Sequence, residues 1–138
     1  MNVTCIFSDD FRSESDGKYS IMGIYGGEII IPTSSFILPR LSITAIVKNS
    51  IEEDDISQMS LEVRLNGRQA LKQEIPPGDL EKVADAFRKQ GIKTVQRTTN
   101  AMLTILPVAP GDILEAIITV NSKVMLKDTL TIGIRPTR

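Results

Sequence analysis

The stretch from Met1 to Pro32, MNVTCIFSDD FRSESDGKYS IMGIYGGEII IP, decides how the rest of the chain is interpreted. Val3, Cys5 and Phe7 alternate with neighbours that are mostly polar, and this two-residue period is typical of a strand with one buried face. We therefore expect a first strand that ends near Ser8.

The residues that follow are dense in charge and turn formers. We expect Ser8 to Gly17 to be a charged loop, because the pair Asp16-Gly17 suits the positive φ of a tight turn. Lys18 to Tyr25 then reads as a second strand. A short β-branched strand, Glu28 to Ile31, follows a glycine pair and ends at Pro32.

Similar alternation recurs along the remaining chain. Asn66-Gly67 lies between two alternating runs and predicts a hairpin, while Pro39 predicts a kinked or edge position at the start of its strand. The expected strands are Phe36 to Val47, Leu61 to Leu65, Leu71 to Ile75, Ala101 to Ile105 and Leu114 to Val120. Val124 to Leu126 and Leu130 to Ile134 are expected to form a final hairpin or one bent strand.

One segment has helical spacing instead. Leu80, Val83, Ala84 and Phe87 recur at helical intervals, which predicts a short amphipathic helix near 79–90 with Asp79 as its N-cap and Gly91 at its end.

About nine short strands and one helix indicate an all-β fold. We expect residues 1–138 to form a single-domain antiparallel β-sandwich, of jelly-roll or immunoglobulin-like type, because helices do not alternate with strands as in α/β folds.

The composition excludes several classes of mechanism. The chain has no histidine, so it cannot hold a Ser-His-Asp or Cys-His nucleophile pair or a histidine-ligated zinc ion. Its net charge of −1 predicts no global attraction to nucleic acid or to a membrane surface, and no cofactor is expected. Cys5 is the only cysteine, which favours an intracellular protein.

The acidic residues of the first quarter suggest two alternative activities. Asp9, Asp10, Glu14 and Asp16, together with Glu52 to Asp55, could supply oxygen ligands for calcium, although their spacing does not match the standard calcium loop. A hydrolase that uses only carboxylates would need a distant partner for the aspartate pair, such as Glu28, because adjacent strand residues point to opposite faces.

A contact surface is the preferred interpretation of these residues. We expect the acids to shape the loop by capping it and by pairing with neighbouring cations. The predicted interaction loop contains Asp9, Asp10, Arg12, Asp16 and Lys18, and no catalytic, cofactor or metal residue is predicted.

The first quarter also resembles an uncharacterised bacterial and phage-associated family. Ser8-Asp9-Asp10-Phe11-Arg12 is followed by Gly17 to Tyr25 (GKYSIMGIY), by Gly27 to Pro32 and by Leu38-Pro39. In that family Cys-Asp-Asp-x-Arg leads into Gly-Lys-x-Ser-x-x-Gly-x-Tyr. Serine stands here at position 8, so no role of the thiol carries over. The resemblance implies a bacterial or bacteriophage origin, so the expected location is the bacterial cytoplasm or a virion.

Together these features predict a non-enzymatic structural or interaction module. We expect protein partners, in a homo-oligomer or a larger assembly, and an accessory or capsid-decorating protein of a phage particle would fit. The alternatives are a small-ligand or calcium-binding β-sandwich and a carboxylate-dependent hydrolase.

Overall fold

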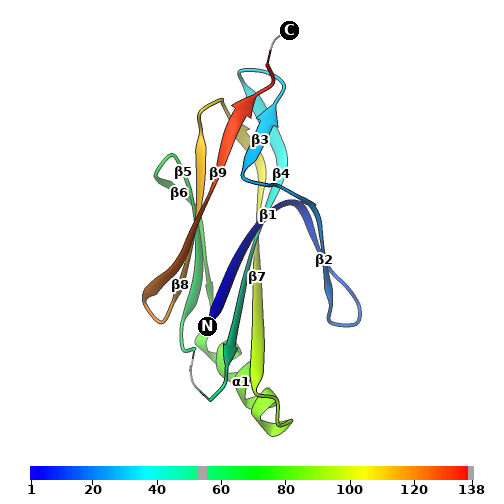
Figure 1. The fold of residues 1–138 in the computed structure, drawn as a ribbon, viewed down its shortest axis with the longest axis vertical. Helices are drawn as coiled ribbons and strands as arrows, with labels where there is room; N and C mark the ends of the chain where they lie inside the picture. Colours follow the sequence, from blue (N-terminus) through cyan, green and yellow to red (C-terminus); the bar gives the residue numbers. More distant parts are fainter. Residues whose placement is uncertain (53–55, 137–138) are drawn as a thin grey trace.

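The computed structural model describes residues 1–52 and 56–136, which form two packed β-sheets and one helix (Figure 1). The four-stranded sheet has the order β2-β1-β4-β7, with β1 at Asn2–Ser13, β2 at Tyr19–Ile24, β4 at Phe36–Ser50 and β7 at Thr94–Val108. The five-stranded sheet has the order β3-β9-β8-β5-β6, with β3 at Glu28–Ile31, β9 at Lys123–Ile134, β8 at Ile113–Val120, β5 at Met59–Leu65 and β6 at Arg68–Ile75.

The prediction of an all-β sandwich is confirmed. Six of the seven strand pairs found in the described residues are antiparallel, and only β3 pairs with β9 in parallel. After β2 the chain passes to the other sheet, where β3 forms the edge beside β9. A parallel pair needs a long connection, and β4 to β8 lie between these two strands in the chain.

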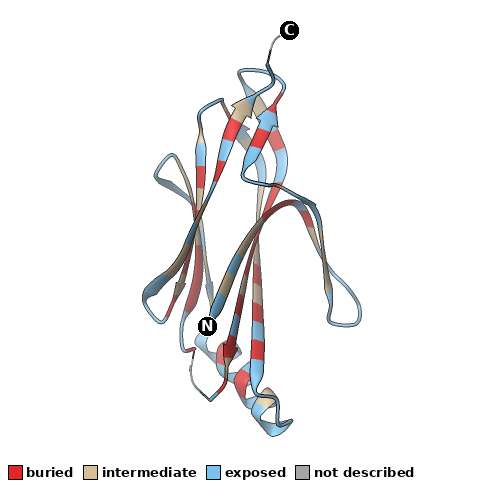
Figure 2. Ribbon diagram, in the orientation of Figure 1, coloured by how far each residue is buried: buried red, intermediate tan, exposed pale blue. Residues whose placement is uncertain are grey.

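The core lies between the two sheets, where the buried residues gather (Figure 2). Every second residue of the central strands points inward, as a two-residue period requires. The four-stranded sheet contributes Leu41, Ile43, Ala45 and Val47 from β4, and the five-stranded sheet contributes Leu61 and Val63 from β5 and Leu114, Ala116 and Ile118 from β8; all of these are fully buried.

The helix α1, Pro77–Lys89, confirms the amphipathic segment expected near 79–90. Leu80 and Ala84 are its buried residues, and the helix lies at one end of the sandwich (Figure 1). Gly91 adopts a φ of +72° and ends the helix, with Ile92 N–H donating to the Phe87 carbonyl at 2.9 Å. The prediction of Asp79 as N-cap is wrong, because Pro76 occupies that position and Asp79 lies in the first turn.

Within the described residues, no helix is long and apolar enough to cross a membrane.

The turn predicted at Asn66-Gly67 is confirmed. Both residues have positive φ, 51° and 82°, and they join β5 to β6. Positive φ at two successive residues matches the right-handed twist of a two-residue hairpin.

The first strand corrects a prediction. We expected it to end at Ser8, but β1 continues to Ser13, so that Asp9, Asp10 and Arg12 belong to a strand rather than to a loop. The turn itself occupies only residues 14–18. Charge density alone gave the wrong boundary, because an edge hairpin in contact with water tolerates charged side chains.

Pro39 interrupts the ladder between β4 and β7. Every residue of β4 from Phe36 to Ser50 pairs with a residue of β7 except Pro39. Ile105 of β7 lies opposite Pro39 and is likewise unpaired. Proline has no N–H to donate there, and Ile105 adopts a φ of 52°. A β-branched residue with positive φ is strained.

This strain predicts that Ile105→Asn stabilises the protein. Ile105 is 71% exposed, so its replacement loses little burial, and asparagine tolerates positive φ. We expect the free energy of unfolding in urea to rise by about 1 kcal/mol. Ile113→Asn is the matched control, because Ile113 is exposed on β8 at negative φ and should not gain stability. Equal effects of the two substitutions would contradict the assignment of strain to residue 105.

Candidate functional site

β1 changes its neighbour at Ser8. From Asn2 to Ser8 it pairs with β4, and Ser8 lies opposite both Ser42 of β4 and Ile24 of β2. Beyond Ser8, β1 pairs only with β2. Residues 9–24 therefore form a hairpin that leaves the sheet, which we call the arm.

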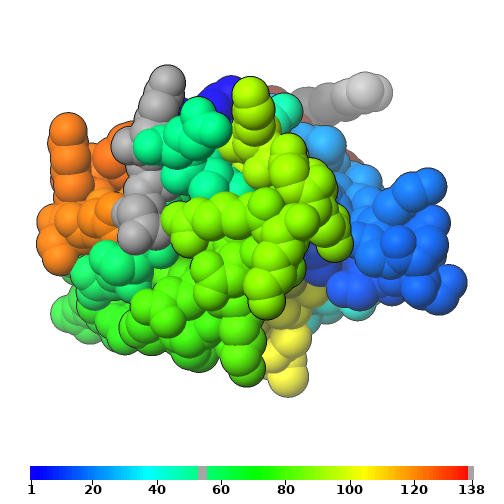
Figure 3. Space-filling model, turned by 90° about the horizontal axis from the view of Figure 1, so that it is seen from below, coloured from blue at the N-terminus to red at the C-terminus, as the bar shows by residue number. Residues whose placement is uncertain are grey.

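The arm lies to one side of the sandwich, beside β4 and β7 (Figure 1), and in an end view it protrudes from the rest of the molecule (Figure 3). Its tip is fixed to β7, because the Tyr19 hydroxyl accepts a hydrogen bond from Gln96 Nε2 at 2.8 Å and lies 3.2 Å from Thr98 Oγ1. Phe11 stacks on Tyr19 with ring centroids 5.3 Å apart. The arm is thus a defined element that is attached at its base and its tip.

A polar layer lies on the face of the four-stranded sheet that the arm approaches. Ser42 and Thr44 of β4 are fully buried although they point away from the core. Asn100 of β7 donates through Nδ2 to Ser42 Oγ at 2.6 Å and to Thr44 Oγ1 at 3.0 Å. Buried hydroxyl groups that find such partners avoid the cost of desolvation.

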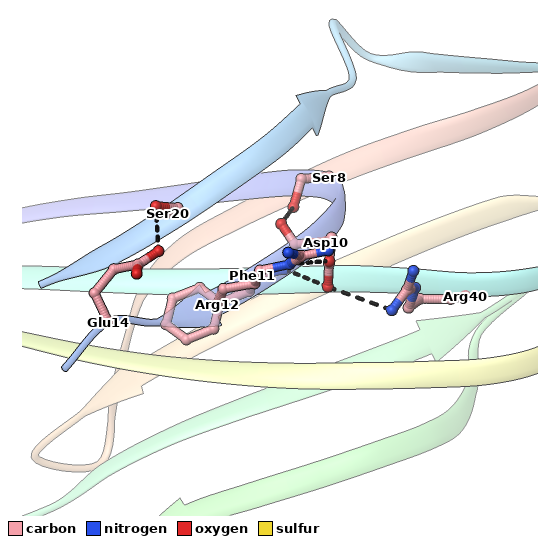
Figure 4. Close-up of polar contacts among 7 residues, drawn as sticks. All are labelled: Ser8, Asp10, Phe11, Arg12, Glu14, Ser20 and Arg40. Atoms are coloured by element: carbon pink, nitrogen blue, oxygen red, sulfur yellow. Dashed lines mark hydrogen bonds and ion pairs between the residues drawn. The ribbon is translucent and has the colours of Figure 1, made fainter.

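Asp10 is the charged residue that anchors the arm base. Its side chain is 9% exposed; Arg12 Nε lies 3.0 Å from Oδ2 and Arg40 Nη1 lies 3.5 Å from Oδ1 (Figure 4). The backbone N–H of Phe11 also donates to Oδ1. The hydrogen bond from Arg12, helped by the charge of Arg40, holds the pKa of Asp10 below its ordinary value although desolvation opposes this.

Asp9 has a different environment. It accepts a hydrogen bond from the Tyr25 hydroxyl, and burial together with this contact raises the pKa of Tyr25 to about 12. The side chain of Asp9 also lies over Gly23, where an added Cβ would come within 2.2 Å of Oδ2. Gly23 has a φ of +69°, so the position requires glycine for two separate reasons.

The turn of the arm holds the other predicted residues. Asp16 accepts from the Lys18 backbone N–H at 3.2 Å and pairs with Lys18 Nζ at 3.3 Å. Glu14 accepts a hydrogen bond from Ser20 Oγ at 2.9 Å (Figure 4). The predicted pairing of acids with Arg12 and Lys18 is therefore confirmed, for Asp10 and Asp16 respectively.

The acids of the first quarter do not converge on one point. Asp9, Asp10 and Asp16 each bind a different partner, and the described residues contain no group of three or more acids or cysteines that could hold a metal ion. Residues 53–55, which were candidates for the calcium alternative, lie outside the described residues. Glu28, the predicted partner of a hydrolase pair, is exposed at the edge strand β3, beside Gly133.

Sequence reasoning missed four residues of this region. Arg40 is 30 positions from Asp10, and Tyr25 is 16 positions from Asp9, so only the fold brings them together. Met22 and Ile24 are the exposed apolar residues of β2, with exposed fractions of 43% and 63%. The sequence placed both residues in the second expected strand but did not show that their side chains face outward.

A shallow apolar hollow adjoins the arm base. It has a volume of about 390 Å³ and is lined by Asp9, Tyr25, β3, Phe36, Leu38 and Arg40. Ile30 of β3 lies in this hollow and is half-exposed. Apolar surface therefore continues around the base of the arm.

No family model matches this chain, and no curated protein matches it. The resemblance of the first quarter to a bacterial and phage-associated family remains a prediction.

The environment of Asp10 predicts a specific pH dependence. Because its native pKa is lowered, its stabilising contribution is complete above the ordinary value of 3.8 and is lost as the pH falls through the native value. In urea unfolding, wild type should be more stable than Asp10→Asn at neutral pH, and the difference should shrink in acid. Asp16→Asn, which removes an exposed carboxylate of the turn, should cost little at neutral pH. A difference between wild type and Asp10→Asn that is the same at every pH would argue against this role.

Gly23 and Gly17 form a matched pair for a second prediction. Both have positive φ, but an added Cβ would have open space at Gly17 and would meet Asp9 at Gly23. Gly17→Ala should cost about 1 kcal/mol from backbone strain, and Gly23→Ala about 2 to 3 kcal/mol, as measured by urea unfolding.

The clash itself is tested by a double-mutant cycle. In an Asp9→Ala background, the cost of Gly23→Ala should fall toward the cost of Gly17→Ala. If it stayed unchanged, Asp9 would not be the group that excludes a side chain at position 23.

Proposed function

We propose that this protein is a non-enzymatic interaction module that binds another protein through its arm, residues 9–24. The observation that carries the proposal is that the arm leaves the sheet and displays apolar side chains away from the core. In the described residues β1 is the only strand that pairs with β2, yet β2 exposes Met22 and Ile24.

The energetics support a contact role for these two residues. A large apolar side chain gains about 1.5 to 3 kcal/mol when it passes from full exposure to full burial. Met22 and Ile24 are 43% and 63% exposed, so folding leaves about half of that energy available for binding. The adjoining apolar hollow at Tyr25, Ile30 and Phe36 would enlarge such a surface. The cations Arg12 and Lys18 are also exposed on the arm and would form a polar rim.

The internal contacts of the arm favour binding over catalysis. Asp10 is occupied by two arginines, and Asp9 by a tyrosine hydroxyl. These contacts fix the shape of the arm, and a rigid contact element loses less entropy when it binds. We propose a larger assembly as the partner, and the resemblance of the first quarter favours a bacterial or bacteriophage setting, such as a particle to which this protein attaches.

Site-specific photo-crosslinking tests this proposal. A photoreactive residue placed at Met22 or Ile24, in cells that make the protein natively, should give one discrete adduct of the same mass from both positions. The same residue at Val124, exposed near the start of β9 in the other sheet, should not give it.

Binding to the purified partner then gives a quantitative measurement. Ile24→Asp should weaken binding by about tenfold or more, because a charge replaces an apolar contact. Val124→Asp is the matched control, because Val124 is similarly apolar and exposed but lies on β9. Equal binding by both variants, or an equal adduct at Val124, would refute the arm as the contact surface.

A further inference from the structure

The free edge of β7 differs from the other sheet edges of the described residues. A sheet edge presents unpaired backbone N–H and C=O groups, which proteins protect by short strands, proline or charge. β3 has only four residues and is followed by Pro32, and β2 has six residues with Gly23 at positive φ. β6 carries Arg68, Lys72 and Glu74.

β7 lacks this protection along its central part, between Arg97 and Pro107. It spans 15 residues and pairs only with β4. From Thr98 to Leu106 it contains no charged residue and no proline. Its side chains there are half-buried or exposed at Met102, Leu103, Thr104 and Ile105.

The hydrogen-bond pattern shows which backbone groups point outward. Ile51 N–H donates to the Lys93 carbonyl at 2.9 Å, so residues 51 and 93 form a hydrogen-bonded pair. The register between β4 and β7 does not shift from Thr94 to Thr104. Because such pairs alternate in antiparallel strands, Ala101 and Leu103 bond to β4, whereas Asn100, Met102 and Thr104 direct their N–H and C=O groups to the free edge.

We propose that β7 pairs in antiparallel orientation with β7 of a second copy of this chain, across a two-fold axis. The two four-stranded sheets then join into one continuous sheet. In such a pair the same segment of each copy lies side by side with the other in the opposite direction. A charged segment would therefore face its own charges, but Thr98 to Leu106 is neutral and brings no like charges together. A copy of the same strand therefore satisfies the edge without any complementary charge, and the proposal does not depend on the arm.

Sedimentation equilibrium of the full chain over a wide range of concentration tests the pairing. We expect the mass to rise from 15.2 kDa toward twice that value. Met102→Lys/Thr104→Lys, which places charge on the edge, should weaken dimerisation by about tenfold or more. Thr129→Lys/Thr131→Lys adds the same charge at exposed alternate positions of β9 and should dimerise like wild type.

Amide hydrogen exchange of wild type gives a readout that needs no variant. The amides of Asn100, Met102 and Thr104 should become protected as the protein associates, whereas those of Ala101 and Leu103 should be protected at all concentrations. A mass of 15.2 kDa at every concentration would overturn the proposal. A dimer in which the amides of Asn100, Met102 and Thr104 stay unprotected would also overturn it. The same holds for a dimer that forms equally well in Met102→Lys/Thr104→Lys, because association would then use another surface.

Discussion

The change of neighbour at Ser8 is the constraint on which the rest of the structure depends. Up to Ser8, β1 adds a strand beside β4 and contributes Phe7 to the core. After Ser8 the same strand leaves β4, and the ion pair of Asp10 with Arg40 lies at the fork. Without this departure there would be no arm, and Met22 and Ile24 would belong to an ordinary edge strand. A buried carboxylate is costly unless it is paired, and Arg12 and Arg40 supply that pairing at the fork.

The same departure explains the unusual polarity of the four-stranded sheet. Its face away from the core carries Ser42 and Thr44, which both accept hydrogen bonds from Asn100. The arm covers this face by polar contacts, including those of Tyr19 with Gln96 and Thr98. The opposite face packs on the second sheet mainly through apolar side chains, among them Leu41, Ile43, Ala45 and Val47. Its buried Thr99 accepts a hydrogen bond from Gln73 of the second sheet at 3.0 Å. One sheet thus separates the core from a polar contact layer.

Local signals predicted most of the fold, and long-range pairings account for what was missed. Asn66-Gly67 and Gly91 were predictable because each needs only its own φ and its nearest neighbours. The extent of β1 was not, because a strand that contains Asp9, Asp10 and Arg12 looks like a loop until Arg40 and Tyr25 are placed beside it. The pairing of Asp16 with Lys18 was predictable for the same local reason, whereas the parallel contact of β3 with β9 joins segments about 100 residues apart. Sequence alone therefore drew attention to the charged residues of the first quarter. It did not show that Asp9, Asp10 and Asp16 each contact a different partner.

Backbone nuclear Overhauser effects in the free protein test the departure of β1 most directly. The structure predicts cross-strand effects between β1 and β2, for example between Arg12 and Ser20, and between Cys5 and Ala45 in the part of β1 that stays in the sheet. It predicts none between the backbones of Arg12 and Leu38, which would lie opposite each other if β1 continued along β4. A clear effect between Arg12 and Leu38 would contradict the account, because residues 9–24 would then be part of the sheet and not an arm.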